Sequence, residues 1–182
     1  MGERAIIHVE GVEFIRDRPF AREVAIAYFD DRPTASWLAM PESEWEAWAS
    51  NEDGSRDRRQ LCSPDGLDPQ TLAVVLRNAL KGMTVYAHWH VSVNWWLWLL
   101  HKAAGEDLSI SVRDARTLVA SYDKDEVLWR QALDDAYDLC PPTERAAIEA
   151  RRLATFIRSL RSHPRPSRAC LPTWPSHRVL RT

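Results

Sequence analysis

The sequence predicts an α/β fold in which one mixed five-stranded sheet is flanked by helices. Three observations support this prediction: three strand-like stretches come first, strands and helices then alternate, and two long helices follow. The expected order of elements is β-β-β-α-β-α-β-α-α. An antiparallel opening followed by β-α-β crossovers is expected to form a single sheet with helices on its faces.

The first part of the chain supplies the antiparallel opening. Strands are expected at residues 4–10, 21–31 and 33–39, and the turn "DDRP" separates the last two, because Asp and Pro favour tight turns. A short amphipathic stretch follows at 42–49, and then a polar connection at 50–66. We expect this connection to be an exposed loop.

The period of the pattern then changes, and the first predicted helix has clear signals at both ends. Asp68 suits the N-cap, Pro69 the first helical position and Gly82 the end, which predicts a helix over 69–81. Periodicity places the other elements in the same way. They are strands at 83–87 and 108–114 and helices at 91–104, 124–139 and 143–160.

Length and charge indicate one compact domain with a flexible end. The chain has 182 residues, which suits a single domain at 1–161. Residues 162–182 are rich in Pro and Arg and contain four arginines and no acid, so we expect a flexible tail there. The first 161 residues then carry 20 basic and 26 acidic side chains, which argues against a broad basic surface for nucleic acid but allows a local basic groove.

The cysteines and the hydropathy pattern point to a cytoplasmic protein that does not enter a membrane. The three cysteines have no CxxC spacing and form an odd set, which indicates neither a disulfide framework nor a zinc knuckle. Residues 83–100 come closest to a membrane span, but histidines, a serine and an asparagine interrupt the run. A buried strand, loop and helix explain this stretch better.

The first strand carries ionisable side chains on one side. In "IIHVEG", His8 and Glu10 are two residues apart and should share a face of the strand. One interpretation is structural: Glu10 pairs with Arg4 or Arg22, and His8 is a hydrogen-bonded histidine. The other is that the two residues belong to a binding or catalytic site, since an unpaired buried charge is costly.

These residues and their neighbours resemble the DEDD superfamily of 3′–5′ exonucleases, which have the ribonuclease-H-like fold. The first motif of that family is Asp-x-Glu, followed by a strand of the type Ile-x-Glu-Ile-(Gly/Ala). "HVEG" and "REVAIA" are the similar stretches here, so that Glu10 matches the Glu and His8 stands at the Asp position. In a second register, "GVEFIRD" makes Glu13 the Glu.

Two later stretches extend the resemblance. "VYAHWHVSVNWW" is similar to the family's Ala-His-Asn motif and places Asn94 or Val93 where an Asp is expected. "ERAAIEA" is similar to the last motif, His-x-Ala-x-x-Asp-Ala, with Glu144 at the His position and Glu149 at the Asp position. By this resemblance Glu10, Asn94 and Glu149 are the candidate metal ligands, and Glu144 and His8 the candidate catalytic groups.

The resemblance implies a two-metal phosphodiesterase site in an altered form. Such sites hold Mg²⁺ or Mn²⁺ with oxygen ligands, and a base activates water beside them. Here His8 and Asn94 replace carboxylates, so we expect a pseudoenzyme: a module associated with single-stranded DNA or RNA, or with a protein, that has little or no nuclease activity. The alternatives are an active exonuclease with an unusual ligand set and an unrelated α/β interaction protein.

The tryptophans of the fourth predicted strand–helix unit have three interpretations, one of which is a platform on which bases stack. Trp95, Trp96 and Trp98 lie in a helix that is largely apolar, which is typical of a buried core helix. If one side of this helix stays exposed, it indicates a protein partner or a homodimer formed through the Trp-rich helix.

Overall fold

The computed structural model describes most of the predicted elements. The described residues are 3–15, 18–30, 32–39, 66–105, 108–122, 125–141 and 145–163, with the backbone alone described at 11–15 and 18–22. The predicted amphipathic stretch at 42–49, nearly all of the connection at 50–66, Glu144 and the tail beyond His163 therefore lie outside the described residues, as does the side chain of Glu13.

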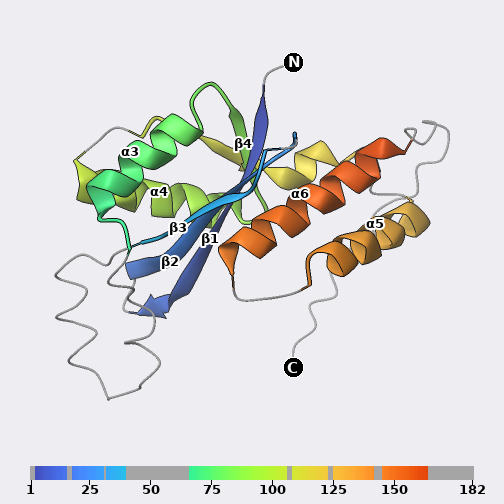
Figure 1. The fold of residues 1–182 in the computed structure, drawn as a ribbon, viewed down its shortest axis with the longest axis horizontal. Helices are drawn as coiled ribbons and strands as arrows, with labels where there is room; N and C mark the ends of the chain where they lie inside the picture. The colour runs from blue at the N-terminus through green and yellow to red at the C-terminus, as the bar shows by residue number, and fades with distance from the viewer. Residues whose placement is uncertain are drawn as a thin grey trace.

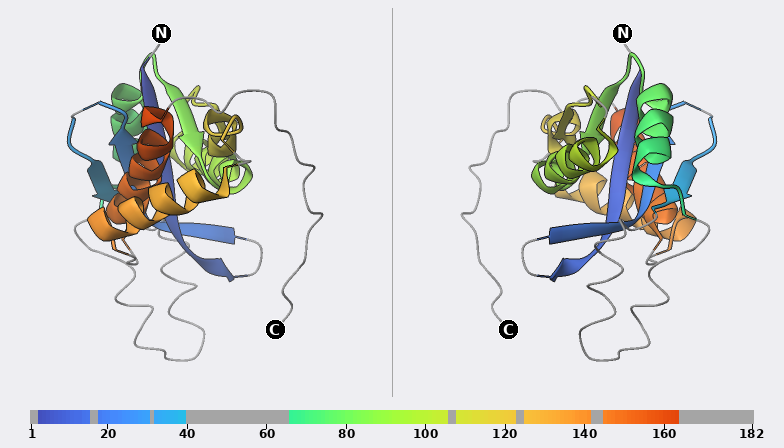
Figure 2. Two further views of the ribbon diagram at one scale, coloured as in Figure 1. Left: turned by 90° about the vertical axis from the view of Figure 1, so that its right-hand side faces the viewer. Right: turned by 90° about the vertical axis from the view of Figure 1, so that its left-hand side faces the viewer.

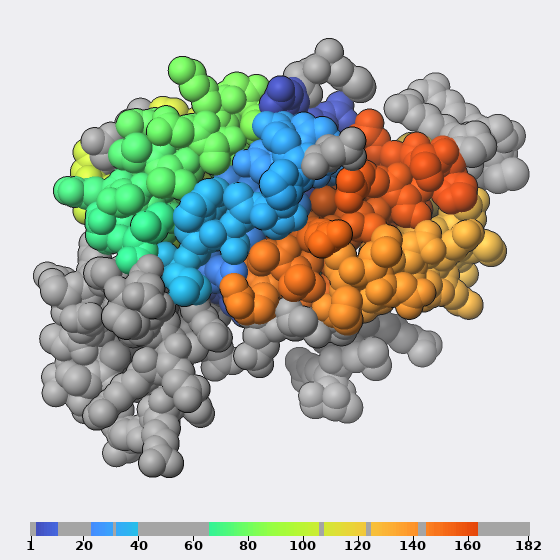
Figure 3. Space-filling model, viewed as in Figure 1, coloured from blue at the N-terminus to red at the C-terminus, as the bar shows by residue number. Residues whose placement is uncertain are grey.

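The predicted mixed five-stranded sheet is confirmed. Its strands are β1 (Arg4–Ile15), β2 (Arg18–Tyr28), β3 (Ala35–Leu38), β4 (Thr84–Ala87) and β5 (Val112–Asp114). They are ordered β3-β2-β1-β4-β5 across the sheet. β2 pairs antiparallel with both β1 and β3, whereas β4 pairs parallel with both β1 and β5. β3 is an edge strand of the sheet. In Figure 3 it lies at the surface between α3 and α6.

The predicted helices are present and begin close to their expected positions. They are α3 (Pro69–Ala79), α4 (His90–Ala104), α5 (Glu126–Leu139) and α6 (Ala146–Ser162), with a short 3₁₀ helix η1 (Ala115–Leu118) between β5 and α5. At the start of α3 the carboxylate of Asp68 accepts from the backbone N–H of Thr71 at 3.0 Å, which confirms the predicted N-cap. Gly105 ends α4 with φ of 63°, the left-handed conformation that glycine adopts easily.

Strands β1, β3 and β5 differ most in length from the prediction, whereas β2 keeps its predicted length and begins earlier, at Arg18. β1 and β2 form a long hairpin that pairs Ala5 with Tyr28 and continues to Ile15 with Arg18, well beyond the predicted end of the first strand. The hydrogen bonds of this non-local pairing extend a stretch whose local pattern ends earlier. In contrast β5 has only three residues, because Ser109 has φ of 46° and so breaks the extended conformation predicted from 108.

The helices cover the sheet on both faces, and Figures 1 and 2 show the resulting three layers. We call the two sides the α3/α4 face and the α5/α6 face. Ala5, Ile7, Val24 and Ile26 pack with apolar residues of α3 and α4. Alternate residues of the same strands, such as Ile6, pack with α5 and α6. In the part of the chain that the structure describes, no helix has the length and apolar character needed to cross a bilayer.

Candidate functional site

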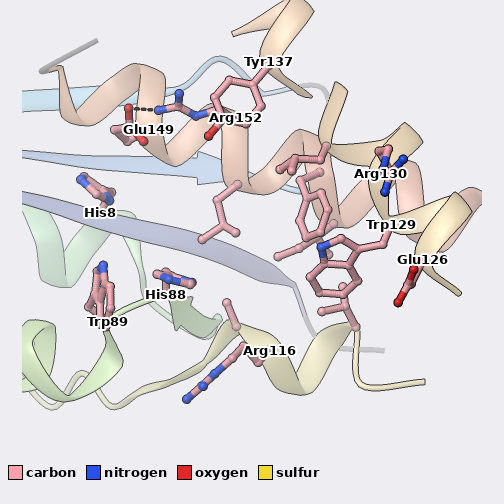
Figure 4. A pocket seen from close by; sticks show the side chains of 16 residues that line it. His8, His88, Trp89, Arg116, Glu126, Trp129, Arg130, Tyr137, Glu149 and Arg152 are labelled. Carbon is pink, nitrogen blue, oxygen red and sulfur yellow. Dashed lines mark ion pairs between the residues drawn. The ribbon is translucent and has the colours of Figure 1, made fainter. Parts of the chain in front are cut away.

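A groove of about 940 Å³ opens between the α5/α6 layer and the carboxyl ends of β4 and β5 (Figure 4). β1 pairs with β4 only as far as Ile6 opposite Tyr86, so the α5/α6 face of β1 loses its neighbour at His8. Crevices at the carboxyl ends of parallel strands are common ligand sites in α/β proteins. The groove is lined by His8, His88, Trp89, Ala115, Arg116, Val119, Glu126, Trp129, Arg130, Leu133, Tyr137, Glu149, Arg152, Leu153, Phe156 and Ile157.

His8 and Glu10 lie on the same face of β1, as their spacing predicts. Nε2 of His8 is 3.3 Å from Oε2 of Glu10, within reach of a hydrogen bond donated by the ring N–H. Burial lowers the pKa of His8 below its usual value and outweighs the hydrogen bond and charge of Glu10, which raise it; the charge of Arg152 lowers it further. The imidazole at the wall of the groove therefore favours its neutral form.

Glu149 lies in the first turn of α6 and forms an ion pair with Arg152, one turn later. This is the i,i+3 pair that the sequence allows. Arg152 is 8% exposed, and its guanidinium carbon lies 5.0 Å from the centroid of the Tyr137 ring on α5. Figure 4 shows the pair on the α6 wall of the groove. A nearly buried cation is thus placed beside the carboxylate that the resemblance assigns to a metal.

Asn94 lies away from these residues. Its Nδ2 donates to the backbone carbonyl of Val112 at 2.8 Å, and its Oδ1 accepts from the backbone N–H of Val112 at 3.0 Å. The side chain thereby joins α4 to β5 as a backbone amide would, and it is not among the groove-lining residues. This arrangement gives Asn94 a structural role, because buried backbone groups need partners.

The described residues do not form the metal site that the resemblance implies. Among them, no three His, Cys, Asp or Glu side chains come close enough to hold a metal ion. The side-chain oxygen of Asn94 is engaged by β5, and Glu149 is engaged by Arg152. Of the predicted residues, the structure therefore brings His8 and Glu149 to the groove and His8 next to Glu10, whereas Asn94 stays apart and Glu144 lies outside the described residues.

A buried acid on β2 was not predicted from the sequence. Glu23 on β2 lies opposite Glu10 in the strand register and is 2% exposed. Its carboxylate accepts from the Arg145 side chain at 2.9 and 3.1 Å and from the backbone N–H of Ala146 at 3.1 Å. Burial raises the pKa of Glu23, but the hydrogen bonds from Arg145 and Ala146 and the Arg145 charge outweigh it, and the net pKa is below its usual value.

Glu23 thereby caps α6 from another element. Arg145 is at the N-cap of α6 and its side chain makes no cap hydrogen bond, so the strand carboxylate satisfies the first helical N–H instead. No local signal in the sequence could have found this contact, because the two partners are 122 residues apart. The contact fixes the start of α6, and with it the position of Glu149 on the groove wall.

Aromatic and basic residues complete the groove. Trp89 follows β4 and is 68% exposed, with its ring edge-on to His88 at 4.8 Å between centroids. Arg116 follows β5, and the carboxylate of Asp114 accepts from its Nε and Nη2. Arg130 on α5 also lines the groove and is exposed, and it forms no ion pair with another of the described residues. The groove therefore combines arginines with an accessible indole.

The Trp-rich helix α4 packs on the opposite face of the sheet. Trp96 is buried in the α3/α4 core, as predicted. Trp98 is 52% exposed, and Nζ of Lys102 lies 5.7 Å from the centroid of its ring. Trp98 does not line the groove.

Comparison with known proteins adds no family to these observations. A scan against models of protein families finds no match, and a search of curated proteins finds no significant similarity. The function of the groove is therefore argued from its own residues.

Proposed function

We propose that this chain is a ribonuclease-H-like module that binds single-stranded nucleic acid in the groove without hydrolysing it. The mixed five-stranded sheet with an antiparallel β2 supports the fold, because the resemblance is to a fold with a mixed sheet that opens with antiparallel strands. The groove contains His8 and Glu149, two of the residues that the resemblance assigns to the site. The observation on which the proposal rests is the pairing of Glu149 with Arg152 inside this groove.

The chemistry of the groove supports binding of a single strand. Proteins that bind single strands combine positive charge along the backbone with aromatic side chains on which bases stack. Arg116 and Arg130 lie along the groove, and Trp89 offers an exposed ring at one end of it. Figure 4 shows Trp89 and Arg130 toward opposite ends of the groove.

The same residues argue against hydrolysis. Metal-dependent phosphodiester cleavage needs several carboxylate oxygens that are free to bind cations. In the groove Glu149 already balances the charge of Arg152, and Glu10, which does not line the groove, interacts with His8. Removing a partner from a nearly buried cation is costly, so Glu149 is held by Arg152 rather than offered to a metal.

Binding and cleavage are tested in one experiment with end-labelled single-stranded DNA and RNA. The wild-type protein should bind in the presence of Mg²⁺ or Mn²⁺ and leave the strands at full length. Trp89→Ala should weaken binding by about 1–3 kcal/mol, the range for loss of one stacked base. Trp98→Ala is the matched control, because Trp98 is also exposed but lies outside the groove.

Each other outcome points to one alternative. Shortening from the 3′ end that disappears in Glu10→Ala or Glu149→Ala would establish an active exonuclease and overturn the proposal. Failure of the folded protein to bind either strand would favour an interaction protein of another kind. Equal losses in the two tryptophan variants would remove the groove as the binding site.

A further inference from the structure

We infer that Glu149 makes the groove selective for guanine over the other bases. This inference deepens the proposed function and rests on it. It starts from the ion pair: both residues line the groove, and the side chain of Glu149 is 27% exposed whereas that of Arg152 is 10% exposed. Glu149 is thus the more exposed of the two charged side chains on the α6 wall.

The carboxylate is also held in place. Arg152 pairs with it on one side and contacts the Tyr137 ring on the other, so the cation is fixed between α6 and α5. The cap that Glu23 makes with Ala146 fixes the first turn of α6, in which Glu149 lies. A preorganised acceptor loses little freedom on binding, and its hydrogen bonds therefore contribute fully to selectivity.

The walls around Glu149 are suited to a base rather than a phosphate. Leu153, Phe156 and Ile157 on α6 continue the groove floor with apolar surface, and Trp89 is drawn toward the same end as Glu149 in Figure 4. A phosphate beside this carboxylate would meet like charge. A base stacked on an aromatic ring would instead direct its polar edge toward the nearest acceptor.

Among the four bases, only guanine presents two adjacent N–H donors on its Watson–Crick edge, at N1 and at the 2-amino group. A carboxylate has two oxygens and no donor, so it accepts both hydrogen bonds at once. Adenine and cytosine place a ring nitrogen acceptor beside their amino group, and thymine flanks its one N–H with carbonyls. Each of these bases would set an acceptor against the carboxylate, and such mismatches lower affinity strongly.

The test uses short fluorescein-labelled oligothymidylates that carry one central guanine, adenine, cytosine or hypoxanthine. Anisotropy titrations of the wild-type protein should give the tightest binding with guanine, by about fivefold or more over adenine and cytosine. Hypoxanthine keeps N1–H but lacks the 2-amino group, so it should fall between guanine and adenine. This comparison needs no variant and does not depend on the folding of one.

Glu149→Gln then assigns the preference to the residue. The variant should lose the preference for guanine, measured as the ratio of the dissociation constants for the guanine and adenine probes. Asp134→Asn, which removes an exposed acid of α5 outside the groove, should keep it. Equal binding of all four probes by the wild type, or a guanine preference that survives Glu149→Gln, overturns the inference and leaves the proposed function standing. No binding of any probe overturns both.

Discussion

The two faces of the sheet are built from alternate residues of the same strands, yet they differ in polarity. On β1, Ala5 and Ile7 enter the α3/α4 core, whereas His8 faces the groove beside α6. Both of the buried charged residues in the described part of the chain, Glu23 and Arg152, belong to the α5/α6 face. A buried charge needs a partner, and each of these has one.

This difference in polarity divides the residues that mainly stabilise the fold, on the α3/α4 face, from those that would contact a ligand under the proposed function, on the α5/α6 face. The α3/α4 face is closed by apolar side chains from α3, α4 and the sheet, which is the usual composition of a protein core. The α5/α6 face is closed near α6 but opens into the groove where β4 ends. We therefore expect substitutions on the first face to change stability most, and those on the second to change ligand binding and pH dependence.

The largest expected effect comes from a cavity in the closed face. Leu76 of α3 is 0% exposed, and Leu76→Ala should lower the free energy of unfolding by about 3 kcal/mol. Leu153→Ala, on the groove wall, should cost only about 1 kcal/mol, because Leu153 is partly exposed and little is buried to be lost. Urea denaturation of both variants measures the difference, and equal losses would contradict the division between the faces.

A smaller loss of stability is expected from the buried acid of the open face. Glu23→Gln should cost about 2 kcal/mol at neutral pH, because it weakens charge-assisted hydrogen bonds but leaves Arg145 exposed to water. The Asp138→Asn variant removes an exposed acid and is the control.

The pH dependence of this loss follows from the lowered pKa of Glu23. Its contribution is complete above the pKa of an unfolded glutamate, about 4.3, and disappears as the pH falls through the lower folded value. The gap in stability between wild type and Glu23→Gln should therefore narrow in acid. A gap that stays constant as the pH falls would show that the charge of Glu23 does not support α6.

The next prediction concerns binding alone. Arg130→Gln should weaken the binding of single strands and reduce the slope of log K against log salt by about 0.7, the value for one contact with a single-stranded phosphate. Its unfolding should be unchanged, since Arg130 is exposed. Arg151→Gln is the control, because Arg151 is at an exposed position of α6 outside the groove. An unchanged slope in Arg130→Gln would show that Arg130 does not contact a phosphate of the bound nucleic acid.

The smallest expected effect is the pH response of His8. Because the pKa of His8 is lowered in the folded state, its contribution to stability is complete above the unfolded histidine pKa of about 6.5. That contribution is lost as the pH falls through the folded value. His8→Gln should therefore flatten the decline in stability between neutral and mildly acidic pH, as followed by thermal unfolding. An identical decline in His8→Gln would show that the titration of His8 does not cause the loss of stability.

Much of the fold could be predicted because its signals are local. Asp68 and Gly105 mark the ends of helices through backbone geometry that neighbouring residues determine. The full length of the β1–β2 hairpin could not be predicted, since it depends on pairing across strands such as Val12 with Phe20. The short β5 was missed because the positive φ of Ser109 leaves no mark in the hydrophobic pattern.

In the candidate site, too, some features follow from local sequence spacing and others depend on tertiary packing. The shared face of His8 and Glu10 follows from strand alternation, and the pair of Glu149 with Arg152 follows from helix spacing. The partner of Glu23 is set by tertiary packing, and so is the engagement of Asn94 by β5. The motif matches drew attention to His8 on β1 and Glu149 on α6, but they could not show which side chains the packing had already engaged.

The contact of Glu23 on β2 with Arg145 at the start of α6 also affects how the protein folds during its synthesis. Its two partners are 122 residues apart, so a nascent chain emerging from the ribosome exposes the α5/α6 side of its hairpin until α6 has been synthesised. Closing so long a loop makes this a late event, because the entropy must be lost before the contact forms. Glu23 and His8 are charged or polar residues on this side of the hairpin, which stays exposed until α6 is made. Their hydration would keep the unfinished sheet from joining other chains while its last helix is still being made.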